Sequence, residues 1–138
     1  MNSDEMSDVE FSGRMARADR WSKLLALVVA MGVFLASNWL VTDPQFSSIT
    51  AAFAGIGARF LIPYRVSLSI PPEERTSIEE HPMAGGFHHG AVGGALSVGS
   101  LVTTGLAAAV LDTTPSLVMG GLATAMAYVA LEELLPRG

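Results

Sequence analysis

Residues 22–41 read SKLLALVVAMGVFLASNWLV, and the four residues that follow, 42–45, read TDPQ. The first stretch is twenty residues long and almost wholly apolar, with Lys23 at its start and Asn38 near its end. As an α-helix it would reach roughly 30 Å, the thickness of the hydrocarbon core of a bilayer. Its apolar run is longer than the roughly 7–15 residues of a signal-peptide core, and no A-x-A cleavage site follows it. We therefore expect a retained membrane-spanning helix.

The TDPQ segment predicts a tight turn. Asp43 is a good N-cap, and Pro44 suits the first position of a helix because its missing N–H would be unpaired there in any case. A second apolar run follows at residues 46–62, and Pro63 is expected to end it. Because the link is so short, the two helices should form an antiparallel hairpin, which we assign to residues 22–63.

The second half of the chain repeats this layout. A third apolar run starts near Ala84 and continues to Leu111, and a turn of sequence DTTP separates it from a fourth. Thr114 can cap the last helix and Pro115 can begin it. We expect an all-α integral membrane bundle of four transmembrane helices in two antiparallel hairpins, the second formed by residues 84–138.

The composition agrees with a chain that lipid largely surrounds. Half of the 138 residues are hydrophobic and 15% are charged, whereas soluble domains carry about 25% charged residues. The 14 glycines fit the higher glycine content of membrane helices. The chain has no cysteine, which excludes disulfides, thiolate metal sites and cysteine nucleophiles.

The basic residues indicate how the helices are oriented. With four spans, a polar tail (residues 1–21), a charged loop (residues 64–83) and the C-terminus share one side, and the turns on the other side contain no Lys or Arg. The positive-inside rule places this basic side in the cytoplasm or in a virion interior. The end of the tail, from Phe11 to Trp21, fits an interfacial helix and a frayed segment equally well. The predicted inner-face anchors are Arg14, Arg17, Arg20, Lys23, Arg59 and Arg65.

Three histidines lie within nine residues, at His81, His88 and His89, and imidazole is a common metal ligand. Adjacent positions on a helix point about 100° apart, so His88 and His89 cannot chelate one ion as an i, i+4 pair does. A haem bound by two histidines usually needs them on facing helices, and the other predicted helices contain none. We therefore predict no metal and no cofactor, and expect an interfacial His pair with polar partners.

Small residues recur at four-residue spacing on the third and fourth predicted helices. Such residues let two helix backbones approach closely, which is how membrane helices associate without a hydrophobic driving force. The partner can be another helix of the chain or a second copy that would form a homo-oligomer through the third helix. The predicted packing residues are Gly86, Gly90 and Gly94, Gly93 with Ser97, and Gly121 with Ala125.

The middle of each predicted span lacks a charged residue. Proton-coupled transporters normally have an acidic residue at that depth, so its absence argues against this class. Arg59 lies near a helix end, where Glu132 or Glu133 can pair with it. Nucleotide-binding loops, nucleophile frames and paired acids are absent, so we predict a non-enzymatic protein with no identified small-molecule substrate. The main hypothesis is a structural or interaction role, with the lipid bilayer as a partner and an internal protein or nucleic acid on the basic side. The alternative is a homo-oligomeric transporter, channel or holin-like pore, because backbone and hydroxyl groups can line a pore.

The layout resembles that of the small internal membrane proteins of pleomorphic, membrane-enveloped viruses of haloarchaea, the pleolipoviruses. The resemblance covers the whole chain and is one of layout and composition, without a diagnostic motif. It implies a multi-span protein that has no external domain and lines the inner face of a viral envelope. The matching features are the acidic segment from Asp4 to Glu10, the Arg-rich approach to the first helix, the turns at Asp43-Pro44 and Thr114-Pro115, and the charged loop from Arg65 to Glu80.

Overall fold

The computed structural model of the chain describes residues 3–69, 71, 88–109 and 112–136, and residues 3–12 as backbone only. These residues form four α-helices and no strand: α1 (Ser3–Val41), α2 (Pro44–Leu68), α3 (His89–Ala109) and α4 (Thr113–Leu134). Each helix is long and apolar enough to cross a membrane. The predicted all-α fold with four such helices is confirmed. Most of the predicted charged loop and residues 84–87 lie outside the described residues.

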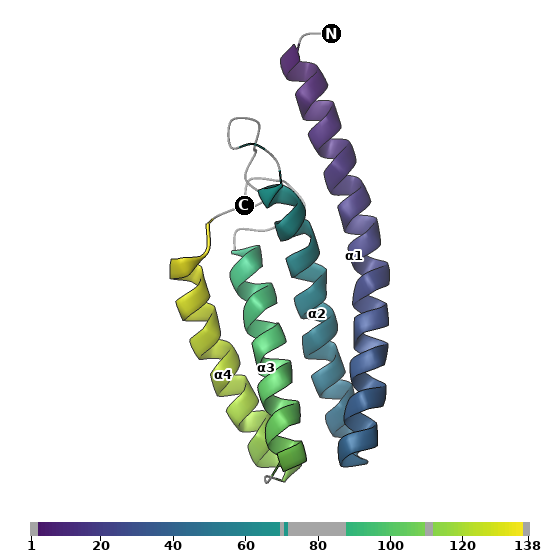
Figure 1. Cartoon of the computed structure of the whole chain (residues 1–138), viewed down its shortest axis with the longest axis vertical. Helices are drawn as coiled ribbons and strands as arrows, with labels where there is room; N and C mark the ends of the chain where they lie inside the picture. Colours follow the sequence, from purple (N-terminus) through teal and green to yellow (C-terminus); the bar gives the residue numbers. More distant parts are fainter. Residues whose placement is uncertain (1–2, 70, 72–87, 110–111, 137–138) are drawn as a thin grey trace.

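The helices lie side by side in chain order, α1 against α2, α2 against α3 and α3 against α4 (Figure 1). Successive helices run antiparallel, so the start of α1 and the end of α4 lie toward the same end of the molecule. α1 and α4 are therefore the outer helices of a row. In their most apolar windows only 6% and 11% of residues are buried, against 44% in α2 and 33% in α3. The outer helices thus leave most of their apolar surface uncovered by the rest of the chain.

α1 is one continuous helix of 39 residues, about 58 Å long at 1.5 Å per residue. The residues assigned to the polar tail are helical from Ser3 and continue into the predicted first span without a break at residue 21. The frayed alternative for the end of this tail is therefore wrong. No proline interrupts it, and Gly13 costs only about 1 kcal/mol of helix propensity. A bilayer with its headgroups is roughly 40–45 Å thick, so α1 is longer than a bilayer is thick.

Two exposed tryptophans mark the ends of the outer surface of α1. Trp21 and Trp39 are 61% and 81% exposed, and the helix between them is about 27 Å long. Tryptophan favours the membrane–water interface, so this spacing fits one Trp at each boundary of the hydrocarbon core. The exposed apolar residues between them on the same side include Leu24, Val28 and Leu35.

The turn between α1 and α2 forms as the sequence predicted. Asp43 caps α2, because its Oδ1 accepts hydrogen bonds from the N–H groups of Gln45 at 3.0 Å and Phe46 at 3.1 Å. The proline that follows Asp43 lies in the first turn of the helix. Thr42, the residue after the end of α1, has a φ of 54°, which is unusual for a β-branched residue. The N–H of Thr42 donates to the carbonyl of Asn38.

α2 continues past its predicted end at Pro63 to Leu68, so the first residues assigned to the loop are helical. A proline inside a helix removes one backbone hydrogen bond and disfavours the helix. Here the residues beyond it are held by tertiary contacts: Tyr64 and Ser67 are buried, and the Tyr64 hydroxyl donates to the carbonyl of Pro136 at 2.7 Å. Packing against the end of the chain therefore overrides the local signal.

α4 begins two residues earlier than predicted. Asp112 is its N-cap residue and Thr113 is its first helical residue, so Thr114 does not cap the helix. Pro115 lies within the first turn, where the backbone N–H groups have no partner inside the helix and a proline costs little. Ser116 Oγ donates to the carbonyl of Asp112 at 2.9 Å and ties this turn to the cap.

Candidate functional site

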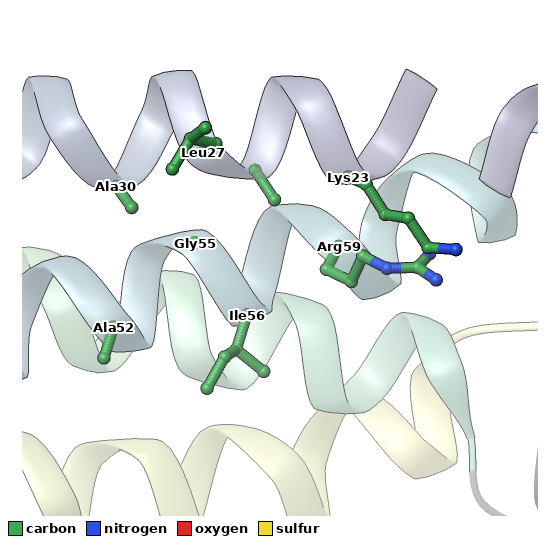
Figure 2. A pocket seen from close by; sticks show the side chains of 8 residues that line it. Lys23, Leu27, Ala30, Ala52, Gly55, Ile56 and Arg59 are labelled. Atoms are coloured by element: carbon green, nitrogen blue, oxygen red, sulfur yellow. The ribbon is translucent and has the colours of Figure 1, made fainter. Parts of the chain in front are cut away.

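A shallow, open groove of about 380 Å³ lies between α1 and α2 (Figure 2). Two cationic side chains lie at one end of it, and the remainder of its lining is apolar. We refer to it as the α1–α2 groove. It is lined by Lys23, Ala26, Leu27 and Ala30 from α1 and by Ala52, Gly55, Ile56 and Arg59 from α2.

The α1–α2 groove exists because small residues bring the two helices close together. A Cβ built on Gly55 would lie 2.9 Å from the Cβ of Ala30 and 3.2 Å from the carbonyl oxygen of Ala26. Such contacts leave no room for a side chain at Gly55. The small side chains around this contact leave the surface hollow, and the larger Leu27 and Ile56 are partly exposed beside it.

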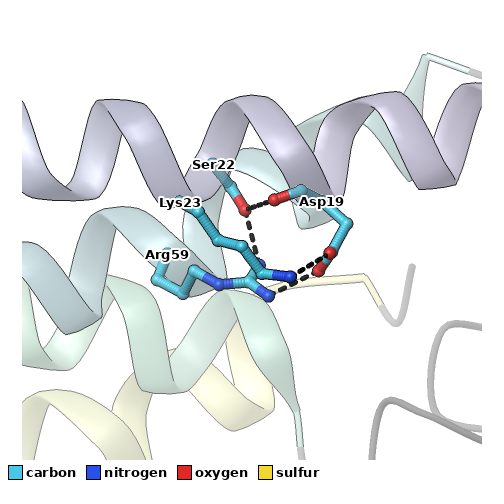
Figure 3. A network of polar contacts seen from close by, with 4 residues as sticks. All are labelled: Asp19, Ser22, Lys23 and Arg59. Atoms are coloured by element: carbon cyan, nitrogen blue, oxygen red, sulfur yellow. Dashed lines mark hydrogen bonds and ion pairs between the residues drawn. The ribbon is translucent and has the colours of Figure 1, made fainter.

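The polar end of the groove is a cluster of four side chains, the charged cluster (Figure 3). Arg59 donates from Nη1 to Ser22 Oγ and from Nη2 to Asp19 Oδ1, both at 2.5 Å. Lys23 Nζ forms an ion pair with Asp19 Oδ2 at 2.9 Å. Ser22 Oγ donates to the carbonyl of Asp19 at 2.8 Å. One carboxylate on α1 therefore joins two cations, one from each helix.

The predicted pairing of Arg59 with Glu132 or Glu133 is wrong, because Arg59 binds Asp19. The row explains the difference: α1 lies directly beside α2, whereas α4 is separated from α2 by α3. The two glutamates are exposed on α4. Ser22, a member of the cluster, is fully buried and accepts a hydrogen bond from Arg59, so this face of α1 is the one turned toward α2.

The structure brings two of the six predicted inner-face anchors, Lys23 and Arg59, into the charged cluster. The side chain of Lys23 is 62% exposed and that of Arg59 is 33% exposed, so both remain accessible from the groove. The other four anchors do not join them; Arg14, Arg17 and Arg20 are exposed along α1, and Arg65 is exposed in the last turn of α2.

His88 caps α3 and binds the end of α4. Its Nδ1 accepts a hydrogen bond from the N–H of Ala91 at 3.2 Å. A neutral imidazole with an accepting Nδ1 carries its proton on Nε2, which faces the carbonyl of Leu135 at 3.1 Å. Tyr64 packs beside it, with ring centroids 5.7 Å apart, and binds the next carbonyl along the chain, that of Pro136. These contacts hold together the ends of three helices.

His89, the other histidine in the described segments, does not join His88 in a ligand set. The ring of His89 packs against Phe60, with centroids 5.4 Å apart, and His81 lies outside the described residues. In the described segments, no group of three His, Cys, Asp or Glu residues is arranged to hold a metal ion. The expected polar partners are confirmed for His88, and both of its ring nitrogens are engaged by them.

Several of the predicted small residues pack against neighbouring helices of the same chain. A Cβ on Gly93 would lie 2.8 Å from the carbonyl oxygen of Gly57, and a Cβ on Gly57 would lie 2.8 Å from Ser97 Oγ. Gly90 faces α2 and Gly94 faces α4. The predicted stripe on α3 therefore serves two internal interfaces.

The α3–α4 contact uses glycines that the sequence analysis did not select. A Cβ on Gly99 would lie 3.2 Å from the carbonyl oxygen of Gly120, and the reverse distance is the same. Gly121, the predicted residue, has no atom within 4 Å of such a Cβ, and Ala125 is exposed. Packing of these two residues against a second copy stays a prediction, and Gly86 lies outside the described residues.

A signal for the missed contact was present in the sequence. Gly99 is followed four residues later by Thr103, and Gly120 is followed four residues later by Thr124. Each threonine hydroxyl donates to the carbonyl of its own glycine, at 2.7 and 2.8 Å. The same Gly-xxx-Thr spacing on two neighbouring helices could have identified the interface.

No protein-family model, curated protein or solved structure matches the chain. The contacts described above are therefore the basis on which a function is proposed.

Proposed function

We propose that the chain is a non-enzymatic integral membrane protein with a structural or interaction role. In this proposal it crosses the bilayer four times, and the start of α1, the segment after α2 and the C-terminus face the inner side. The layout resemblance favours the envelope of a haloarchaeal pleomorphic virus as its location, and a cell membrane is the other setting.

The observation that carries this proposal is the use of the hydroxyl groups inside the helices. Thr50, Thr103 and Thr124 donate to carbonyls of their own helices at 2.7–3.0 Å. Ser97 does the same at 2.8 Å, and Ser100 donates across the α2–α3 interface to the carbonyl of Thr50 at 3.2 Å. Hydroxyl groups are what an uncharged pore would present to its solute. Here their protons are donated to backbone carbonyls, and the bond from Ser100 joins α3 to α2, as in a packed scaffold.

The outer surfaces also support a role in lateral contacts within the membrane. α4 carries exposed apolar side chains at Val118, Leu122, Met126 and Val129, which are 55–74% exposed. α1 has a similar surface between its two tryptophans. Such surfaces fit lipid or other membrane-embedded proteins.

The basic end supports an inner-facing orientation. Arg14, Arg17 and Arg20 are exposed on the part of α1 near or beyond the membrane boundary. Exposed arginines of this kind attract anionic lipid headgroups, acidic surfaces of an internal protein, or nucleic acid.

Solute leakage from liposomes tests the proposal. The purified chain is reconstituted into liposomes loaded with a self-quenching dye or an ion reporter, beside protein-free liposomes and liposomes with a known pore former. The scaffold proposal predicts leakage equal to that of the protein-free liposomes. Leakage that rises with the amount of protein would support the pore alternative and overturn the proposal. Identifying what copurifies with the native assembly would then name the partner.

A further inference from the structure

We propose that the α1–α2 groove binds one anionic phospholipid. Its phosphate lies at Lys23 and Arg59, and one of its acyl chains lies along the apolar part of the groove. The proposal requires the chain to span a membrane, but it does not require the structural role proposed above.

The depth of the charged cluster suits a lipid phosphate. Lys23 lies two residues from Trp21, whose exposed ring fits the membrane boundary at this end of α1. From Lys23 to the end of α1 at Val41 the helix is about 27 Å long, close to the thickness of the hydrocarbon core. Arg59 lies about 23 Å from the start of α2, and its long side chain can reach the same boundary.

The shape of the groove suits an acyl chain. Ala30 lies seven residues from Lys23, and Ala52 lies seven residues from Arg59, so the apolar part extends about 10 Å from the cations along the helices. Figure 2 shows the two cations at one end and these two alanines at the other. Because lipid chains run from the headgroup toward the bilayer centre, a lipid held at the cations has its chain aligned with the groove.

The charge of the cluster favours an anionic lipid over a zwitterionic one. Lys23 and Arg59 contribute two positive charges, and Asp19, the carboxylate that contacts both, contributes one negative charge. The cluster therefore keeps an excess of positive charge at the headgroup level. Asp19 and Ser22 each use one donor of the Arg59 guanidinium. A guanidinium has five N–H donors and an ammonium has three, so donors remain for phosphate oxygens.

Native mass spectrometry of the detergent-purified full chain tests the charge requirement. The chain is titrated with phosphatidylglycerol and with phosphatidylcholine of the same acyl chains. We expect tighter binding of phosphatidylglycerol, and we expect Lys23→Gln to weaken it roughly fivefold, the effect of one cation near a membrane surface. Phosphatidylcholine binding should change less. Arg65→Gln removes an exposed cation of α2 outside the groove and should leave both affinities unchanged.

A second pair of variants tests the groove itself. Ala52 is exposed in the groove lining, so Ala52→Leu should fill part of the groove without disturbing the contact between the helices. We expect this variant to bind both lipids several-fold more weakly. Ala125→Leu makes the same change at an exposed position on α4 and should leave the affinity for both lipids unchanged. Thermal unfolding in detergent shows whether each variant is folded. If Lys23→Gln is not folded, the comparison of Ala52→Leu with Ala125→Leu tests the lipid site by itself.

Three results would overturn the proposal. The first is equal affinity for the two lipids in the unaltered chain. The second is a change in lipid affinity that is as large in each matched control as in its groove variant. The third is a change in oligomeric mass on Ala52→Leu or Lys23→Gln with lipid binding unchanged, which would assign the groove to a second copy of the chain.

Discussion

Ser22 and Ser37 lie on the same helix and are equally buried, at 0% and 1% exposed, but their hydroxyl groups have different surroundings. Ser22 Oγ accepts from Arg59 and donates to the carbonyl of Asp19. Ser37 Oγ has no hydrogen-bond partner in the described part of the chain. A hydrogen bond to a charged group stabilises by about 1.5–3 kcal/mol, whereas a buried polar group without a partner costs about 1–3 kcal/mol.

Replacing each serine by alanine should therefore have opposite consequences. We expect Ser22→Ala to lower the free energy of unfolding by about 1–2 kcal/mol, because it removes the partner of a charged donor. Ser37→Ala should leave stability unchanged or raise it by up to about 1 kcal/mol. Unfolding in mixed micelles, titrated with a denaturing detergent and followed by helicity, measures both. An equal loss in the two variants would show that packing of the serine Cβ, and not the hydroxyl, determines stability at these sites.

His88 combines two roles that single substitutions can separate. Its Nδ1 caps α3 at Ala91, and its Nε2 contacts Leu135 at the end of α4. Asparagine is a good N-cap residue, but its side chain is too short to make both contacts. We expect His88→Ala to cost about 1 kcal/mol and to speed hydrogen exchange of the Ala91 amide. His88→Asn should restore slow exchange at Ala91 and leave the contact with Leu135 broken. If both variants exchange equally fast, the contact with α4 and not the cap holds the start of α3.

At the scale of elements, the α3–α4 interface depends on which of two adjacent glycines faces the neighbouring helix. Gly120 faces Gly99 and Thr103 of α3, and Gly121 faces away. We expect Gly120→Ala to lower the free energy of unfolding by about 1–3 kcal/mol, because the added methyl group overlaps the Thr103 hydroxyl. Gly121→Ala, the matched control, should be neutral or stabilise by up to about 1 kcal/mol, because alanine is the better helix former. Similar losses in both variants would contradict the assigned rotation of α4.

The elements also show where sequence reasoning succeeds. The turn at Asp43 was predictable because an N-cap followed by proline is local chemistry. The end of α2 was not, since the burial of Tyr64 against the C-terminal segment keeps the helix going past Pro63. The choice between Gly120 and Gly121 also failed, because a shift of one residue turns a side chain by about 100° around the helix.

The charged cluster could not be predicted from the sequence. Asp19 and Arg59 are separated by forty positions, and their contact depends on how α1 is rotated and on α1 being the neighbour of α2. The prediction placed Arg59 about one turn from the end of its helix, but α2 continues for nine more residues to Leu68. It also chose the partner of Arg59 from α4, as a closed bundle would allow. Sequence periodicity gives the number and length of the helices, but it does not show that they form an open row.

At the scale of the whole molecule, the open row makes orientation in the membrane testable with single labels. The chain has no cysteine, so one introduced thiol gives an unambiguous signal. Ser69 is exposed directly after the end of α2, and Ala16 is exposed on α1 one turn before Asp19, the partner of Arg59. Gln45 and Thr114 are exposed in the first turns of α2 and α4, at the opposite end of the helices. A cysteine at each position, in separate variants, reports on which side of the membrane that end of the helices lies.

We expect a membrane-impermeant maleimide to label Gln45→Cys and Thr114→Cys from outside sealed cells, and Ala16→Cys and Ser69→Cys only after the membrane is opened. The reason is electrostatic: the arginines cluster at the end that holds Ala16 and Ser69, and basic segments are retained on the inner side. The cysteine-free chain is the control for background labelling. Labelling of all four positions from outside would mean that the chain does not span the bilayer. Labelling of Ala16→Cys and Ser69→Cys from opposite sides would mean that α1 and α2 do not cross it as a hairpin, and the lipid site between them would then lie at the wrong depth for a phosphate.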